Sequence, residues 1–299
     1  MPFFAQLSFL RKESAYLVPF LVSTLPVVPL PGGARSCIMG EEVLCMKVLL
    51  VNDDGYGAPG LMALFDCMRV RHEALIVAPD GQRSGAGQSV TLGQPIRARR
   101  MEHGYAVTGT PADCVKIGVR HLMPDCDLVV SGINPGANLG VDCNYSGTAS
   151  AAREAVMQGR AALAASCYCR EFRDVEHLAC ITAQTAELLL ENPLPKGVFL
   201  NLNMPNLTRG QSMPMEFAPM GWFVYDEEFE RCDLGGEEIE FRPKYGKQTP
   251  VQAAGCDLER VRAGIATLTP VTWDCTSLAD VRIAQQIADK MKDAGIALA

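Results

Sequence analysis

The stretch Lys47-Val48-Leu49-Leu50-Val51-Asn52-Asp53-Asp54-Gly55 decides the fold class and points to the functional site. It begins as a short apolar run closed by turn-forming residues, which is the pattern of a buried parallel strand. Ligands of open α/β sheets bind at the carboxyl ends of the strands, where Asp53 and Asp54 would lie. Two adjacent carboxylates repel each other unless a cation lies between them, so the pair predicts a divalent metal site. The alternative is a turn with a capping Asp, for which one Asp would be enough.

Strand-like and helical patterns alternate from residue 46 to about residue 205. Strands are expected at 47–51, 74–78, 128–130, 161–167 and 197–203, and helices at 61–70, 113–121, 146–159 and 174–192. Repeated βα units of this kind predict an α/β fold with a Rossmann-like, doubly wound, mostly parallel sheet. Two further short strands, at 90–100 and 105–107, would form a hairpin.

The composition changes after Pro205. Residues 206–260 are polar, punctuated by Gly and Pro, and aromatic, which predicts a C-terminal β-hairpin arm rather than more βα units. Aromatic residues exposed on such an arm often form subunit contacts. A strand at 265–270 and an amphipathic terminal helix at 277–298 complete the pattern.

Four segments follow from these patterns: an N-terminal extension (1–45), a catalytic core (46–205), a β-rich oligomerisation arm (206–260), and a returning strand with the C-terminal helix (261–299). The extension carries basic residues before an apolar run, as a signal peptide does, but prolines interrupt it and no clean cleavage site follows. We expect it to be non-native or disordered, with translation starting at Met46 or Met39. Mass spectrometry of the native N-terminus tests this, because peptides from the extension would contradict it.

Composition excludes several classes of protein. The 299 residues carry a net charge of −7, a poor match for a DNA- or RNA-binding scaffold that grips phosphates by bulk charge. No apolar run reaches the roughly 18 residues that a membrane-spanning helix needs. The 12 cysteines form no Cys-x-x-Cys motif, which argues against a zinc site. A disulfide framework is not expected in a chain of this length. The cysteines indicate a reduced, cytoplasmic protein.

Three loops that follow predicted strands would meet along one edge of the sheet. Their side chains offer carboxylate, hydroxyl and amide oxygens, in the segments Asn52–Asp54, Arg83–Gly85 and Ser131–Asn138. Oxygen ligands without Cys or His suit Mg²⁺ or Mn²⁺ rather than zinc. A fourth segment, Ser146-Gly147-Thr148, opens a helix and would bind phosphate through its free N–H groups and hydroxyls. The alternative for this segment is ordinary helix capping by Ser or Thr.

Five ordered segments resemble the SurE family, the stationary-phase survival protein nucleotidases. They are residues 51–60, 77–85, 109–115, 131–140 and 145–149. The resemblance weakens through 206–250, returns at 255–257 and 263–270, and does not include the first 45 residues.

The resemblance implies a metal-dependent phosphatase that releases phosphate from nucleoside monophosphates, a 5′-nucleotidase with 3′-nucleotidase and exopolyphosphatase activity as further options. It implies one divalent cation per subunit, Mg²⁺ or Mn²⁺, and cytoplasmic homodimers or homotetramers joined by a swapped C-terminal arm. The cation ligands would be Asp53, Asp54, Ser84 and Asn134. Asp53 or Asp54 would accept a proton from the attacking water. We predict that substrate contacts come from Asn52, Gly85, Asn138, Ser146, Gly147 and Thr148.

Three rival functions stay open. A haloacid-dehalogenase-type phosphatase would use an aspartyl nucleophile, and trapping a phosphoenzyme would identify it. A non-catalytic nucleotide-binding module on the same fold would show no metal-dependent turnover. A nucleoside hydrolase would release free base rather than phosphate.

Overall fold

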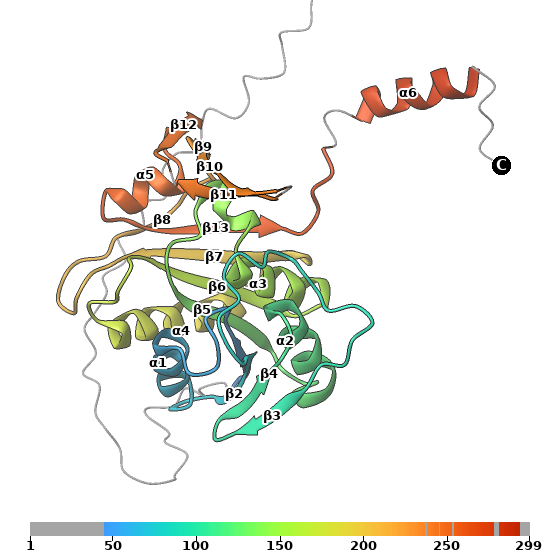
Figure 1. Ribbon diagram of the computed structural model, residues 1–299. Coiled ribbons are helices and arrows are strands. Elements are labelled where there is room, and N and C mark those ends of the chain that lie inside the picture. The colour runs from blue at the N-terminus through green and yellow to red at the C-terminus, as the bar shows by residue number, and fades with distance from the viewer. Residues whose placement is uncertain (1–44, 237, 245, 253, 278–280, 294–299) are drawn as a thin grey trace, which may run out of the picture. The chain divides into compact units, whose positions relative to one another are not determined.

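A nine-stranded sheet is the centre of the computed structural model, which describes residues 45–236, 238–244, 246–252, 254–277 and 281–293 (Figure 1). Its strands are β1 (Lys47–Val51), β2 (Glu73–Pro79), β3 (Ala98–Met101), β4 (Gly104–Val107), β5 (Leu128–Pro135), β6 (Ala161–Tyr168), β7 (Val198–Pro205), β8 (Met215–Phe217) and β13 (Ala266–Thr272). The order across the sheet is β3-β4-β2-β1-β5-β6-β7-β13-β8.

The sheet is mostly parallel and doubly wound, as the sequence predicts. The six strands from β4 to β7 are parallel neighbours, and β13 runs antiparallel to β7. The chain passes from β1 to its neighbour β2, and later returns to form β5, which lies next to β1 on the side away from β2. The carboxyl ends of the neighbouring strands β1 and β5 therefore form the switch point of the sheet, where doubly wound folds bind their ligands.

Helices cover both faces of the sheet (Figure 1). On one face, α1 (Pro59–Met68) and α4 (Val175–Glu191) pack against each other and against strand residues such as Val48 and Leu50. On the other, α2 (Pro111–Ile117) and α3 (Gly147–Met157) pack over residues such as Leu49 and Val51. Because β1 is buried on both faces, nearly every one of its residues is apolar.

The position of α4 departs from the usual rule of crossover handedness. The β5–α3–β6 and β6–α4–β7 connections advance in the same direction across the sheet, but their helices lie on opposite faces. The two crossovers therefore have opposite hands, whereas parallel crossovers are right-handed in about 98% of cases. As a result α4 lies on the same face as α1, although the β1–α1–β2 connection advances in the opposite direction across the sheet.

Local capping explains where α2 begins. Thr110 Oγ1 accepts from the Asp113 N–H (3.2 Å) and Asp113 Oδ2 accepts from the Thr110 N–H (3.0 Å), which is a capping box. Asp113 also accepts from the Thr91 hydroxyl (2.6 Å) and the Thr91 N–H. Thr91 is therefore bonded to the start of this helix, and the strand expected at 90–100 begins only at Ala98.

The strand expected at 128–130 is longer than predicted. It continues to Pro135, with a register shift against β6 between Ser131 and Asn134. Asn134 therefore lies at the end of a strand rather than in a loop. The prediction was wrong because Ser131, Gly132 and Asn134 look like turn residues in the sequence.

The chain beyond β7 forms the β-hairpin arm and the terminal helix that were expected. Strands β10 (Glu228–Gly235) and β11 (Glu238–Lys244) pair as an antiparallel hairpin, and β9 (Trp222–Tyr225) pairs with β12 (Gln248–Gln252). The short α5 (Asp257–Arg262) precedes β13, and α6 (Val281–Asp293) ends the described chain. Phe229 and Phe241 are exposed on the arm, whereas Phe223 is buried against Leu139.

Some predictions fall outside the described residues, namely those on residues 1–44 and on the ends of the terminal helix at 278–280 and 294–299. The proposed segment boundaries stay predictions. Within the described part of the chain, no helix is long and apolar enough to cross a membrane.

Candidate active site

The loop after β1 is a tight turn closed by Asn52. Its side-chain Nδ2 donates to the Gly55 carbonyl (3.0 Å) and its Oδ1 accepts from the Gly55 N–H (3.2 Å). Gly55 has a φ of +107°, and a Cβ there would lie 3.2 Å from Gly81 Cα, so the loops after β1 and β2 touch. Asn52 therefore shapes the loop, and its contact with substrate stays a prediction.

Asp53 lies at the N-terminus of α3. Its Oδ1 accepts a hydrogen bond from the Thr148 hydroxyl (2.6 Å), and the backbone N–H groups of Gly147 and Thr148 also donate to the carboxylate. Burial raises the pKa of Asp53, and these hydrogen bonds partly offset the rise. A Cβ on Gly147 would lie 2.6 Å from Asp53 Cβ, so only glycine allows this approach.

The segment predicted to bind phosphate, Ser146-Gly147-Thr148, has another role in the structure. Gly147 and Thr148 already hold a carboxylate of the chain itself, because a helix N-terminus binds any anion. Ser146 Oγ accepts from the Ala149 N–H (3.0 Å), which is ordinary helix capping. Phosphate contacts by Ser146, Gly147 and Thr148 stay a prediction, and the direct role visible in the structure is to orient Asp53.

Asp54 differs from its neighbour. Its Oδ2 is buried without a hydrogen-bond partner among the described residues. Burial and the adjacent charge of Asp53 raise the pKa of Asp54 to about 6. A buried carboxylate oxygen without a donor is costly. A divalent cation at this oxygen would remove the cost, so the two carboxylates fit a metal ion.

The remaining metal ligands would be neutral oxygens. The described part of the chain contains no cluster of three or more His, Cys, Asp or Glu side chains suited to a metal. Hydroxyl, amide and water oxygens would have to complete the shell around Asp53 and Asp54, which suits Mg²⁺ or Mn²⁺.

Ser84 and Asn134 are the residues predicted to supply such oxygens, and this assignment stays a prediction. The Arg83 N–H donates to the Asp53 carbonyl (2.7 Å), which fixes the loop of the exposed Ser84 and Gly85 next to the carboxylates. Asn134 lies at the end of β5, the neighbour of β1. Its Nδ2 donates to the Gly136 carbonyl (2.5 Å), which leaves its Oδ1 for a cation.

Asn138 is buried in a network that anchors the loop after β5. Its Nδ2 donates to Ser166 Oγ (2.7 Å), and its N–H donates to Asn203 Oδ1 (2.8 Å). Its carbonyl accepts from Nδ2 of both Asn201 (2.9 Å) and Asn203 (3.2 Å). The predicted contact of Asn138 with substrate stays untested, and the network gives it a structural role.

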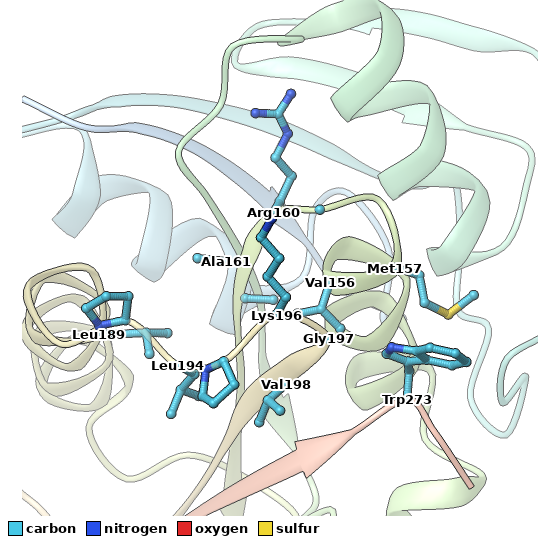
Figure 2. Close-up of a pocket in the computed structure, with 14 residues that line it drawn as sticks. Val156, Met157, Arg160, Ala161, Leu189, Leu194, Lys196, Gly197, Val198 and Trp273 are labelled. Carbon is cyan, nitrogen blue, oxygen red and sulfur yellow. The ribbon is translucent and has the colours of Figure 1, made fainter. Parts of the chain in front are cut away.

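A cavity of about 590 Å³ lies at the opposite edge of the sheet (Figure 2). It is lined by the C-terminal ends of α3 and α4 and the first residues of β6 and β7, with Trp273 at one side. None of its lining residues is acidic. Because it lacks carboxylates and lies away from the switch point, it does not match the predicted metal site.

Comparisons with known proteins agree with the sequence motifs. The family described as survival protein SurE matches residues 48–227. A 5′-nucleotidase SurE of Nitrosococcus oceani is 39% identical over 237 residues, which cover 78% of this chain and 94% of that protein. The chain belongs to the SurE family. A 5′-nucleotidase SurE of Heliobacterium modesticaldum is 36% identical, over 82% of this chain and 91% of that protein. The crystal structure of the SurE protein from Aquifex aeolicus superposes with a TM-score of 0.73 at 33% identity, covering 81% of this chain and 99% of that one.

One structural residue near the site was not predicted. Asp257 is fully buried and accepts from the N–H groups of Gly140 (2.7 Å), Gly221 (2.9 Å) and Leu258 (2.8 Å). It thereby ties the turn before α3 to the start of the arm. Its segment, 255–257, was among those that resemble the SurE family, but no feature of the sequence indicated which backbone groups it would bind.

Proposed function

We propose that this member of the SurE family is a divalent-metal-dependent 5′-nucleotidase, which hydrolyses nucleoside monophosphates to nucleoside and phosphate. The observation that carries the proposal is the pair Asp53 and Asp54 at the switch point, with Asp54 Oδ2 buried and unpartnered among the described residues. The relatives from Nitrosococcus and Heliobacterium are both named 5′-nucleotidase SurE, which supports the choice of substrate.

The residues of the site have separate tasks in this proposal. Asp53, Asp54, Ser84 and Asn134 would hold one Mg²⁺ or Mn²⁺. When bound, such an ion lowers the pKa of a coordinated water and withdraws charge from the phosphate. Thr148 and the N-terminus of α3 fix the Asp53 carboxylate, so its geometry is set before substrate binds.

Proton transfer is better assigned to Asp54 than to Asp53. Asp53 Oδ1 is already engaged by the Thr148 hydroxyl, whereas burial and the charge of Asp53, and no hydrogen bond from the described residues, set the pKa of Asp54. One oxygen of Asp54 could then bind the cation while the other accepts a proton. We therefore propose that Asp54 accepts the proton of the attacking water. The Ser146 hydroxyl can still donate, since its oxygen acts only as acceptor for Ala149, and it would contact a phosphoryl oxygen.

The assembly is proposed to be a homodimer or homotetramer formed through the C-terminal elements. Large apolar side chains are exposed on α6, and aromatic ones on the hairpin of β10 and β11. On α6 they are Val281, Ile283, Ile287 and Met291. A second subunit would remove this apolar surface from water. We also propose a cytoplasmic location, in keeping with the free thiols of all described cysteines.

A panel of phosphate esters tests this function against its rivals. The protein is incubated with Mn²⁺ and nucleoside 5′-monophosphates, 3′-monophosphates or short polyphosphate, and both free phosphate and free base are measured. Phosphate from the 5′-monophosphates supports the proposal, and phosphate from the other substrates would add the further activities. Free base would identify a nucleoside hydrolase, and a trapped phosphoenzyme would identify an aspartyl nucleophile. A protein that binds nucleotides without turnover would be a binding module.

A further inference from the structure

Two cysteine thiols touch between α1 and α4, away from the metal site. The Sγ atoms of Cys67 and Cys180 are 3.6 Å apart, with the Cys67 thiol donating to Cys180. Cys67 lies in the last turn of α1 and Cys180 in the second turn of α4. Both residues are half-buried, so neither is fully enclosed in the core.

Neighbouring contacts hold the two helices in this register. Just after the end of α1, Arg71 Nη1 donates to Glu187 Oε2 of α4 (3.2 Å), and His72 Nε2 lies 2.9 Å from Glu187 Oε1. The two helices also share one continuous apolar cluster. The thiol contact is therefore part of a fixed interface and not a chance meeting of two mobile side chains.

The two thiols differ in acidity. The hydrogen bond from Cys67 lowers the pKa of the Cys180 thiol, against the effect of burial. The charge of Arg209 also lowers this pKa, whereas the charges of Asp174 and Glu176 raise it. The same hydrogen bond, together with burial, raises the pKa of Cys67. A thiolate beside a protonated thiol is the arrangement in which one sulfur attacks and the other resolves.

We propose that Cys67 and Cys180 are a peroxide-sensitive pair that forms a reversible disulfide between α1 and α4. The pair is a modification site distinct from the nucleotidase site, and it takes hydrogen peroxide or an organic hydroperoxide as oxidant.

The chemistry balances with peroxide as the only co-reactant. The Cys180 thiolate attacks one peroxide oxygen: an S–O bond forms, the O–O bond breaks, and the leaving hydroxide takes up the proton that Cys180 had released. The sulfur of Cys67 then attacks the sulfenic sulfur of Cys180, an S–S bond forms and the S–O bond breaks. The second hydroxide takes the proton of the Cys67 thiol. Two thiols and one hydrogen peroxide thus give one disulfide and two waters, and with an organic hydroperoxide the first leaving group is the alkoxide, so one alcohol and one water form.

The cross-link would stabilise the folded chain. The two cysteines are 113 positions apart, so a disulfide would close a long loop and reduce the entropy of the unfolded state. From the loop length we expect the melting temperature to rise by roughly 5 °C or more. Phosphate release should stay unchanged, because neither cysteine contacts the loops after β1, β2 or β5 that form the proposed metal site. The inference does not depend on the proposed nucleotidase function.

Peptide mapping tests the proposal directly. The full-length protein is reduced, desalted and treated with hydrogen peroxide, and the remaining thiols are alkylated before tryptic digestion without reductant. Trypsin releases residues 48–69 and 174–196, each of which carries one cysteine, Cys67 or Cys180. We expect these two peptides to appear as one cross-linked species that dithiothreitol separates, and the melting temperature to rise with it. Oxidised protein in which both peptides remain separate and alkylated would overturn the proposal.

A second cysteine pair provides the competing outcome. Cys167 and Cys169 interact through their side chains and lie together in the peptide 161–170. A disulfide confined to this peptide would contradict the proposal. Cys67→Ser and Cys180→Ser should each abolish the shift in melting temperature, whereas Cys169→Ser should keep it. Melting curves under dithiothreitol show whether each variant is folded, and a peroxide-induced shift that survives in Cys180→Ser would also contradict the proposal.

Discussion

Asp53 and Asp54 are neighbours in the chain but have unlike environments. Asp53 is held by the Thr148 hydroxyl and the N–H groups at the start of α3, while Asp54 keeps a buried oxygen without a partner among the described residues. The Asp53 carboxylate is fixed in place by its hydrogen bonds, whereas a nearby positive charge would stabilise the buried Asp54 carboxylate. The sequence could indicate a pair of carboxylates but not this division of roles.

Gly147 is the residue most sensitive to a small change. In Gly147→Ala the new methyl group would lie 2.6 Å from Asp53 Cβ and 2.8 Å from its Oδ2, so the carboxylate must move. Displacement of a catalytic group by about 1 Å can lower the rate by roughly 100-fold. We expect a loss of this order in kcat/KM for phosphate release, measured alongside the melting temperature.

Gly57→Ala is the matched control, since a Cβ at Gly57 would meet no atom within 4 Å. Gly57 lies in the loop after β1, which also carries Asp53 and Asp54, and this variant should keep normal turnover. A Gly147→Ala enzyme with normal kcat/KM would show that the contact with Asp53 does not position the catalytic carboxylate.

At the scale of elements, the start of α2 depends on Asp113. Burial alone would raise the pKa of this carboxyl, but hydrogen bonds from Thr91 and Thr110 outweigh it and hold the pKa below its usual value. A lowered pKa in the folded state means that the stabilising effect is complete above the unfolded pKa and is lost as the pH falls.

Asp113→Asn should therefore destabilise the protein by about 1 kcal/mol near neutral pH, the usual effect of losing a helix cap. The difference in the free energy of unfolding between wild type and variant should shrink as the pH falls below about 3.8, the ordinary value for this carboxyl. Urea unfolding at a series of pH values measures it. A difference that grows toward acid would contradict the assignment.

The helix α4 shows what sequence patterns cannot predict. Its existence and its length follow from the apolar periodicity of 174–192, and Asp174 caps it by accepting from the His177 N–H (3.0 Å). The face of the sheet that α4 covers could not be predicted from the sequence, because the general rule of right-handed crossovers would place this helix on the same face as α3. The contact between Cys67 and Cys180 exists only because α4 lies beside α1.

At the scale of the whole molecule, the switch point was predictable and the supporting contacts were not. Short apolar runs ending in Asn, Asp, Ser and Gly predict which strand ends carry the oxygen ligands, because parallel strands share one carboxyl edge. The engagement of Thr148 with Asp53, the burial of Asn138 and the bonds from Gly140 and Gly221 to Asp257 depend on residues far apart in the chain. Local patterns contain no information on such contacts.

The exposed apolar face of α6 provides a test of the assembly. Replacing Ile283 and Ile287 together by Asp should convert the proposed dimer or tetramer to monomers, because charge would be buried in the subunit contact. Light scattering after size-exclusion chromatography measures the mass. Gln285→Glu, on the polar side of the same helix, is the control and should keep the wild-type mass. A wild-type protein that is already monomeric would contradict the proposed assembly.

The central claim is that Asp53 and Asp54 hold a divalent metal that is needed to release phosphate from nucleotides. The most direct measurement is free phosphate from AMP with Mn²⁺ or Mg²⁺, with and without EDTA, for the wild type and for Asp54→Asn. We predict phosphate only when metal is present and a loss of nearly all activity in Asp54→Asn, with an unchanged circular dichroism spectrum. Phosphate release that persists in EDTA, or in a folded Asp54→Asn variant, would contradict the account.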